Sequence, residues 1–268
     1  MKLKSNSKIN LALWIKEKRV DGYHELETIF YENKDLYDEI EIEILDDVSE
    51  EVEVSFLQNE FSNLIPQQDN LAYKAARLFF EKTKLKKSCK IRINKNIPLQ
   101  AGLGGGSSNA ASVLKGLNKL SGDKLNESEL LNIASILGSD VPFFILGGIC
   151  LGKGKGEILE KFQCKLAFEL KIAKPANVSV STKWAYEQID AREFFPDHSS
   201  QMENLMMALK DGNYNSFIKN IFNDFESVVF SFYPELINLR KKLLNEGYDC
   251  VGLCGSGSAL FAVKIAAS

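Results

Sequence analysis

The chain has 268 residues and a formal net charge of −3, with 45% hydrophobic and 26% charged residues. This composition is typical of a soluble globular protein and gives no electrostatic reason to expect nucleic acid or an anionic membrane as a partner. No apolar run approaches the length of a bilayer span, the first lysines are not followed by the apolar stretch of a signal peptide, and the five cysteines include no Cys-x-x-Cys pair. We therefore expect a cytoplasmic protein with reduced cysteines.

The first half of the chain predicts a mixture of strands and helices. Residues 40–44 read Ile-Glu-Ile-Glu-Ile, the period of two that is typical of a strand with one buried face. Asp69 or Asn70 is a candidate helix N-cap, and Asn126 or Ser128 is another, with Gly138 ending that helix. The elements expected here are strands at 8–15, 37–57 and 89–93, a helix after each cap, and a helix from a Gly-rich loop to about Leu120.

The second half predicts a mixture of the same kind. Residues 147–156 look like a strand that breaks into a Gly-rich turn, and we place a domain boundary there. The elements expected beyond it are a strand at 166–173, a helix at 182–190, two or three helices within 201–245, and strands at 249–254 and 259–264. Because strands and helices do not alternate strictly, the pattern favours an α+β fold, with domains at 1–154 and 155–268.

A Gly-rich loop between a predicted strand and a predicted helix is the most informative segment. Residues 98–111 read Pro-Leu-Gln-Ala-Gly-Leu-Gly-Gly-Gly-Ser-Ser-Asn-Ala-Ala. The glycines let backbone N–H groups turn toward a ligand, and the N-terminus of the following helix favours an anion. A simple turn would need only one or two glycines, and the four in this loop would lose conformational entropy without a ligand. We therefore interpret the loop as a phosphate-binding site.

Two common phosphate-binding patterns do not match this loop. A P-loop requires Lys directly after its last Gly, and the first Lys after Gly102 is Lys115. The dinucleotide fingerprint requires Gly or Ala at its sixth position, which is Ser107 when counted from Gly102 and Asn109 when counted from Gly104. The loop therefore belongs to another class.

Residues 102–111 resemble the nucleotide loop of the galactokinase, homoserine kinase, mevalonate kinase and phosphomevalonate kinase (GHMP) superfamily. The triple Gly before Ser-Ser-Asn is similar to the version in its diphosphocytidyl-methylerythritol kinases. Segments that resemble the family's other motifs are Ser-Lys-Ile-Asn-Leu at 7–11, Asp-Gly-Tyr-His-Glu at 21–25, Ser-Asp-Val-Pro-Phe-Phe at 139–144 and Gly-Ser-Gly-Ser at 255–258. The chain departs from the family at Asn6-Ser7, where Pro-Ala is usual, and at Cys254, where Ser is common.

The resemblance implies two α+β domains, the second ferredoxin-like, with the active site in the cleft between them. It implies transfer of the γ-phosphoryl group of ATP, with Mg²⁺, to the 2-hydroxyl of 4-diphosphocytidyl-2-C-methylerythritol in non-mevalonate isoprenoid biosynthesis. The expected partners are these small molecules. The oligomeric state and the metal ligands stay open, with the Ser108 hydroxyl as one candidate ligand.

Lys8 and Asp140 match the family's catalytic Lys and Asp. On their own, Lys8 would be interpreted as an exposed lysine and Asp140 as a helix N-cap or turn residue. An alcohol has a pKa of about 16 and an Asp of about 4, so proton transfer before attack would cost about 16 kcal/mol. Asp140 is therefore expected to orient the hydroxyl and accept its proton as the bond to phosphorus forms, while Lys8 keeps Asp140 ionised.

The family's acceptor site implies roles for four further residues. Tyr23 is expected to stack on a cytosine and Tyr186 to cover the opposite face of the base. His24 is expected to hydrogen-bond the edge of the base, and Asn10 to contact polar groups of the substrate. Without the resemblance, Tyr23 would be interpreted as packing beside a turn at Gly22.

For the nucleotide, Asn70 and Lys95 match positions that contact the purine or ribose. Their simpler interpretations are a helix cap and a strand-end lysine. The loop residues expected to contact ATP are Gly102, Leu103, Gly104, Gly105, Gly106, Ser107, Ser108 and Asn109.

Two alternatives stay open from the sequence. A relative within the superfamily would phosphorylate another small alcohol, such as homoserine or mevalonate. A nucleotide-binding regulator or scaffold would keep the loop and lack catalysis. Tyr23 and His24 favour the cytidine substrate over the first alternative, and Lys8 and Asp140 favour an enzyme over the second.

Overall fold

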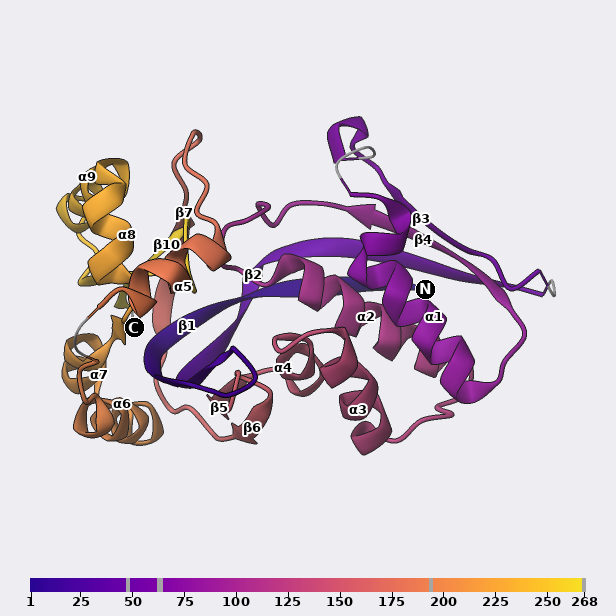
Figure 1. Ribbon diagram of the computed structural model, residues 1–268, viewed down its shortest axis with the longest axis horizontal. Coiled ribbons are helices and arrows are strands. Elements are labelled where there is room, and N and C mark those ends of the chain that lie inside the picture. The colour runs from indigo at the N-terminus through magenta and orange to yellow at the C-terminus, as the bar shows by residue number, and fades with distance from the viewer. Residues whose placement is uncertain (47–48, 62–64, 193–194, 267–268) are drawn as a thin grey trace. The chain divides into compact units, whose positions relative to one another are not determined.

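The computed structural model describes residues 1–46, 49–61, 65–192 and 195–266, and it divides into two compact units. Unit 1 comprises Met1–Lys8, Glu32–Pro98 and Gly104–Gly147, whereas unit 2 comprises Ile9–Tyr31, Leu99–Leu103 and Gly148–Ser268. The segments interleave because two long strands, β1 (Lys2–Lys18) and β2 (His24–Leu45), contribute to both units (Figure 1). The boundary between residues 154 and 155 stays a prediction, since compactness divides the chain elsewhere.

The sheet of unit 1 is built on the second half of β2. Glu39–Leu45 pair antiparallel with β4 (Ser88–Asn94), which pairs in parallel with β3 (Val52–Phe56) on its other edge. β1 follows β2 in the strand order. Ile40 and Ile42 are buried and Glu43 is exposed, so the strand that the period of two predicts is confirmed.

Helices gather on one side of these strands (Figure 1). They are α1 (Leu71–Thr83), α2 (Gly105–Leu120), α3 (Glu127–Leu137) and α4 (Val141–Leu146), with short 3-10 turns at Asn59–Phe61 and Gln67–Asp69. Of the candidate caps, Asn70 accepts a hydrogen bond from the N–H of Ala72, and Asn126 forms a capping box with Glu129. Gly138 ends α3, as predicted.

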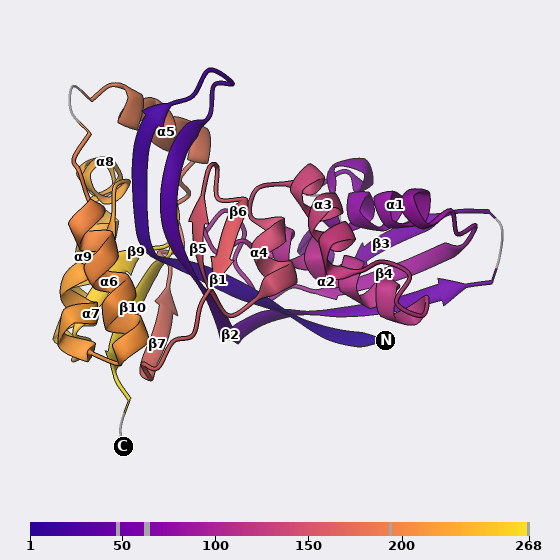
Figure 2. The ribbon, with the colours of Figure 1, turned by 90° about the horizontal axis from the view of Figure 1, so that it is seen from below.

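Unit 2 contains strand pairs on β1 and β2 and a separate three-stranded sheet (Figure 2). The first group consists of β5 (Ile149–Lys153) antiparallel to Thr28–Tyr31 of β2, β6 (Ile158–Lys161) antiparallel to β5, and β8 (Phe222–Asn223) parallel to β1. The second sheet has the order β7 (Phe168–Ala173), β10 (Leu260–Ile265), β9 (Cys250–Leu253), with both pairs antiparallel.

The helices of unit 2 differ from the prediction in number. They are α5 (Thr182–Asp190), α6 (Ser199–Asp211), α7 (Tyr214–Asn220), α8 (Glu226–Phe232) and α9 (Pro234–Asn245). The described residues 201–245 thus contain four helices where two or three were expected. Gly212 ends α6 in a left-handed conformation, Asn213 caps α7, and Pro234 begins α9, so the breaks between α6 and α7 and between α8 and α9 have local causes.

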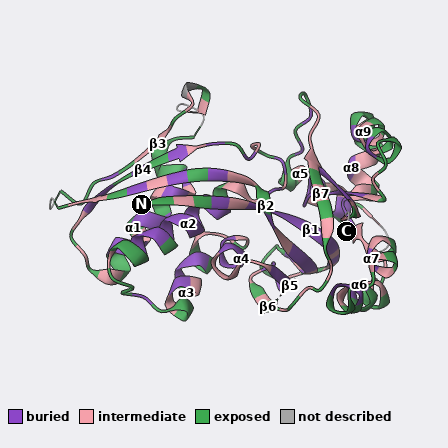
Figure 3. Cartoon of the chain, turned by 180° about the vertical axis from the view of Figure 1, so that it is seen from behind, coloured by how far each residue is buried: buried purple, intermediate pink, exposed green. Residues whose placement is uncertain are grey.

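Each unit has its own buried apolar residues, and buried segments of β1 and β2 are visible in Figure 3. The core of unit 2 includes Leu13, Phe225, Leu236, Leu253 and Leu260. Strands and helices follow one another without strict alternation, so the predicted α+β class is confirmed. None of the described helices is long and apolar enough to cross a bilayer.

Asn118 ties the end of α2 to the loop before α3, and its loss is expected to destabilise unit 1. Its side chain donates to the carbonyl oxygen of Leu125 and accepts from the N–H of Leu125, both at 2.9 Å. Asn118→Ala is expected to lower the free energy of unfolding by about 2–4 kcal/mol, because two backbone groups lose their partners. The control Asn132→Ala, at an exposed position of α3, is expected to change it by less than about 0.5 kcal/mol. Equal changes in the free energy of unfolding of the two variants, measured by urea denaturation, would contradict this role of Asn118.

Candidate active site

The Gly-rich loop packs closely on β1 and α4 at Gly104, the residue before α2. Gly104 has a φ of +69°, in the left-handed region. A Cβ at this position would lie 2.8 Å from the ring of Phe144 and 3.1 Å from Cγ of Lys8. Only glycine therefore allows the first N–H groups of α2 to lie this close to Lys8.

Tertiary contacts explain two further glycines of the loop. A Cβ at Gly105 would lie 2.8 Å from Nζ of Lys95, and a Cβ at Gly102 would lie 1.8 Å from the carbonyl oxygen of Cys254. Gly106 is exposed, and a Cβ there would make only ordinary contacts. Packing thus excludes a side chain at Gly102 and Gly104 and disfavours one at Gly105 without any ligand. The number of glycines in this loop therefore does not by itself indicate a ligand.

Lys8 and Asp140 lie next to each other beside this loop. Nζ of Lys8 is 3.6 Å from Oδ2 of Asp140, which is an ion pair longer than a hydrogen bond. Lys8 is buried, whereas the Asp140 side chain is 32% exposed. Asp140 occupies the N-cap position of α4, but its side chain makes no capping hydrogen bond. The helix-cap interpretation therefore does not account for its carboxylate, which faces Lys8 and reaches solvent.

Ser108 and Asn109 direct their side chains into unit 1. The hydroxyl of Ser5 on β1 contacts both, at 2.7 Å from Oγ of Ser108 and 2.9 Å from Oδ1 of Asn109. All three residues are buried, and the role of the Ser108 hydroxyl as a metal ligand stays a prediction. Ser107 is half-buried at the start of α2. A contact of Ser108 or Asn109 with the nucleotide stays a prediction.

Lys95 is a buried cation whose partner is Asp38. Its ammonium and that carboxylate are paired with 4% and 0% of their side chains exposed. Burial lowers the pKa of Lys95, and the charge of Asp38 opposes that shift only in part. Asp38 also accepts hydrogen bonds from the N–H groups of Asn96 and Ile97. The pair fixes the chain that leads into the Gly-rich loop.

Asn70 acts as the N-cap of α1. Its Oδ1 accepts from the N–H of Ala72 at 2.9 Å, so the interpretation of Asn70 as a helix cap is confirmed. A direct contact of Asn70 or Lys95 with ATP stays a prediction.

In unit 2, His24 and Tyr186 are brought together. Their rings stack with centroids 4.9 Å apart and an interplanar angle of 15°. Nε2 of His24 lies 2.6 Å from Oδ1 of Asp190, and Lys18 donates to the other oxygen of that carboxylate. The structure places the Tyr186 ring against His24, and its predicted contact with the base stays a prediction.

Tyr23, Asn10 and Leu103 also belong to unit 2. The Tyr23 side chain is largely exposed, and Nζ of Lys155 lies 4.5 Å from the centre of its ring. Asn10 is buried and donates from Nδ2 to the hydroxyl of Thr28 at 2.8 Å. Leu103 is buried as well, so its side chain serves packing.

The predicted residues thus gather within each unit. Unit 1 contains Lys8, Asp140, Asn70, Lys95 and the loop from Gly104 onward, and unit 2 contains the acceptor residues with Gly102 and Leu103. Sequence reasoning missed Ser5, Asp38 and Asp190, which hold these groups in place. Their signals were weak, because a polar residue in a strand or at a helix end is ordinarily solvated. The expected cleft between two domains stays a prediction.

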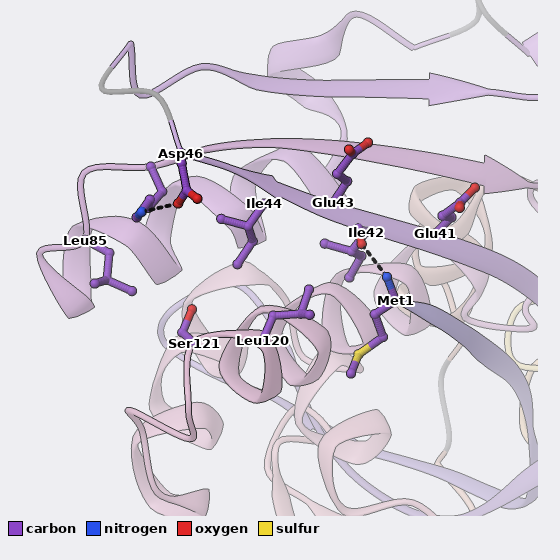
Figure 4. A pocket seen from close by; sticks show the side chains of 10 residues that line it. Met1, Glu41, Ile42, Glu43, Ile44, Asp46, Leu85, Leu120 and Ser121 are labelled. Carbon is purple, nitrogen blue, oxygen red and sulfur yellow. Dashed lines mark hydrogen bonds and ion pairs between the residues drawn. The ribbon is translucent and has the colours of Figure 1, made fainter.

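A surface pocket of unit 1 contains none of these residues. It is lined by Met1, Glu41, Ile42, Glu43, Ile44, Asp46, Leu85, Lys87, Leu120 and Ser121 (Figure 4). The N-terminal amino group donates to the carbonyl oxygen of Ile42 at 2.6 Å, and Lys87 pairs with Asp46. The pocket's own charged groups are therefore already engaged, and it forms no part of the candidate site.

Comparison with known proteins identifies the family. Residues 70–148 match the GHMP kinases N terminal domain, and residues 205–264 match GHMP kinases C terminal. The 4-diphosphocytidyl-2-C-methyl-D-erythritol kinase of Caldicellulosiruptor saccharolyticus is 38% identical over 263 residues, covering 98% of this chain and 88% of that protein. The protein of the same name from Alkaliphilus metalliredigens is 39% identical over 266 residues, with 98% and 87% covered.

Solved structures agree with this assignment. A crystal structure of 4-(cytidine 5'-diphospho)-2C-methyl-D-erythritol kinase matches with a TM-score of 0.79 at 32% identity, covering 98% of this chain and 90% of that one. A homoserine kinase from Cytophaga hutchinsonii matches with a TM-score of 0.75 at 17% identity, covering 97% and 85%, and shows the shared fold alone. The chain belongs to the family of 4-diphosphocytidyl-2-C-methyl-D-erythritol kinases, within the GHMP kinases.

Proposed function

We propose that this chain phosphorylates the 2-hydroxyl of 4-diphosphocytidyl-2-C-methyl-D-erythritol with ATP, a step of non-mevalonate isoprenoid biosynthesis. The observation that carries the proposal is the packing of Gly104 on Lys8, whose ammonium lies 3.6 Å from the Asp140 carboxylate. A helix end suited to phosphate and a Lys–Asp pair suited to an alcohol thereby lie side by side. The relatives that carry this activity in their names support the identity of the acceptor.

The proposed reaction divides the work between the loop and the pair. Backbone N–H groups at the start of α2 bind the phosphates of ATP, and Lys8 offsets the charge on the transferring group. Asp140 orients the acceptor hydroxyl and takes its proton as the new O–P bond forms and the bond to the β-phosphate oxygen breaks, releasing ADP. The 32% exposure of the Asp140 side chain leaves room for the hydroxyl.

The divalent cation stays an expectation, as does a cytoplasmic location. Bound together with ATP, Mg²⁺ would neutralise phosphate charge during the transfer. Within the described ranges no cluster of three metal-ligating side chains is present. An ion that arrives with ATP needs few protein ligands, and the partly exposed Asp140 carboxylate beside Lys8 would be a candidate ligand.

On the acceptor side, the proposal assigns His24 and Tyr23 to cytosine. The stacked pair of His24 and Tyr186 and the exposed ring of Tyr23 supply flat aromatic surface with a polar edge. Asn10 follows Lys8 by two residues on β1, so both side chains point to the same side of the strand. Asn10 would contact polar groups of the substrate near Lys8.

The direct test is ADP release with Mg²⁺, ATP and three parallel acceptors: 4-diphosphocytidyl-2-C-methyl-D-erythritol, homoserine and mevalonate. We expect turnover with the cytidine compound alone. Turnover with another acceptor would keep the catalytic pair and discard the cytosine assignment. ATP binding without turnover of any acceptor would favour a nucleotide-binding regulator.

Asp140→Asn is expected to lower kcat by about 10²–10⁴-fold, because the amide cannot accept the proton of the hydroxyl. ATP binding, measured by calorimetry, should change little, since the phosphates are assigned to α2. The matched control is Asp123→Asn, an exposed position in the turn after α2, which should retain full activity. Near-normal turnover of Asp140→Asn would reject the assignment of the base.

Gly104→Ala tests the close approach of the loop. Its Cβ would displace Phe144 or Lys8, so we expect kcat/KM for ATP to fall by about tenfold or more. Gly122→Ala is the control, because Gly122 has a similar φ of +79° but open space around it. Both variants should lose about 1–2 kcal/mol of stability from backbone strain. Equal losses of activity would show that strain alone is responsible.

A further inference from the structure

His24 is oriented by two residues of one helix. Tyr186 and Asp190 are four residues apart on α5, so they lie on the same face of that helix. Tyr186 stacks on the imidazole, and Asp190 approaches Nε2 to 2.6 Å. The His24 side chain is 4% exposed. The helix therefore fixes both the plane of the ring and the direction of its Nε2.

Asp190 can only accept in this contact. Partial burial raises the pKa of Asp190, but hydrogen bonds from Lys18 and His24 lower it by more, so the carboxyl is ionised at neutral pH. An ionised carboxylate has no proton to donate, and Nε2 of His24 must therefore carry one. Lys18 is a second cationic partner of the Asp190 carboxylate.

When the imidazole is neutral, the other ring nitrogen is an acceptor. In a neutral imidazole with Nε2 protonated, Nδ1 has a lone pair and no hydrogen. Among the residues that the structure describes, Nδ1 of His24 has no hydrogen-bond partner. Nδ1 is not among the completely buried unpaired side-chain atoms of the described residues, so it is not fully shielded from solvent.

We infer that Asp190 is a positioning residue that fixes His24 as the Nε2–H tautomer, so that Nδ1 selects a base with an amino group. The inference rests on the proposed function, in which His24 meets the edge of cytosine. Cytosine presents an N4 amino donor where uracil presents the O4 acceptor. Two acceptors facing each other away from water are strongly disfavoured. Asp190 thus discriminates between cytidine and uridine acceptors through His24.

The test compares kcat/KM for the cytidine acceptor with that for its uracil analogue. Asp190→Asn can donate its amide N–H to Nε2, which moves the imidazole proton to Nδ1. We expect the ratio of the two kcat/KM values to fall by about tenfold or more, mainly through KM. Asp190→Glu keeps an acceptor-only group and should retain most of the selectivity. The control Asp211→Asn, at the exposed end of α6, should leave the ratio unchanged.

A second measurement needs no acceptor substrate. The chain contains two histidines, so ¹⁵N-histidine labelling gives two assignable imidazoles. His198 is a useful reference, since both of its nitrogens lie 3.0 Å from oxygen atoms, of Gln201 and Asp224. We expect protonated Nε2 and unprotonated Nδ1 for His24 in the wild-type protein, and the reverse in Asp190→Asn.

The outcomes separate this inference from the proposed function. If the wild-type protein phosphorylates the cytidine acceptor and Asp190→Asn keeps the same selectivity, the inference is wrong and the function stands. A wild-type His24 protonated at Nδ1 also overturns it, and this measurement holds even if Asp190→Asn does not fold. Failure of the wild-type protein to phosphorylate either acceptor overturns the proposed function, and the inference with it.

Discussion

The close packing of Gly104 against Lys8 and Phe144 is the constraint on which the candidate site depends. A helix N-terminus attracts phosphate through its unpaired N–H groups, but that attraction serves a reaction only when the reacting groups are near. Here the absence of one side chain lets the start of α2 approach β1 and α4 together. Asp140 precedes α4 directly, so the same contact sets the carboxylate beside Lys8.

The chemically important side chains share a second feature: each is held by a hydrogen bond to a residue of another helix or strand. Lys95 is held by Asp38, Asn10 by Thr28, and His24 by Asp190. Each anchor satisfies a polar group that burial would otherwise penalise. Each also leaves its partner little freedom to rotate, so geometry is established before a substrate binds. The energetic requirement of burial and the functional requirement of orientation are met by the same contacts.

Local signals predicted the helix starts and ends well. Asn70 and Asn126 cap helices because a side-chain oxygen satisfies an N–H at i+2 or i+3, which is a contact between near neighbours in sequence. In the second half, the sequence predicted fewer helix breaks than the structure contains. Gly212 disfavours a helix interior and Asn213 can cap a new helix, and the left-handed conformation of Gly212 shows that α6 ends there.

The sequence by itself determined the family, the α+β class and the candidate catalytic pair. The family's motifs are short runs of residues, and both the runs and their order along the chain can be recognised without a structure. Only the tertiary structure decided why the loop contains its glycines, since Gly102, Gly104 and Gly105 face atoms contributed by segments far away in the chain. It also decided which partners hold the site. Asp38 lies 57 residues from Lys95, and Asp190 lies 166 residues from His24. Contacts over such separations leave no periodicity or spacing in the sequence, because folding alone brings them together.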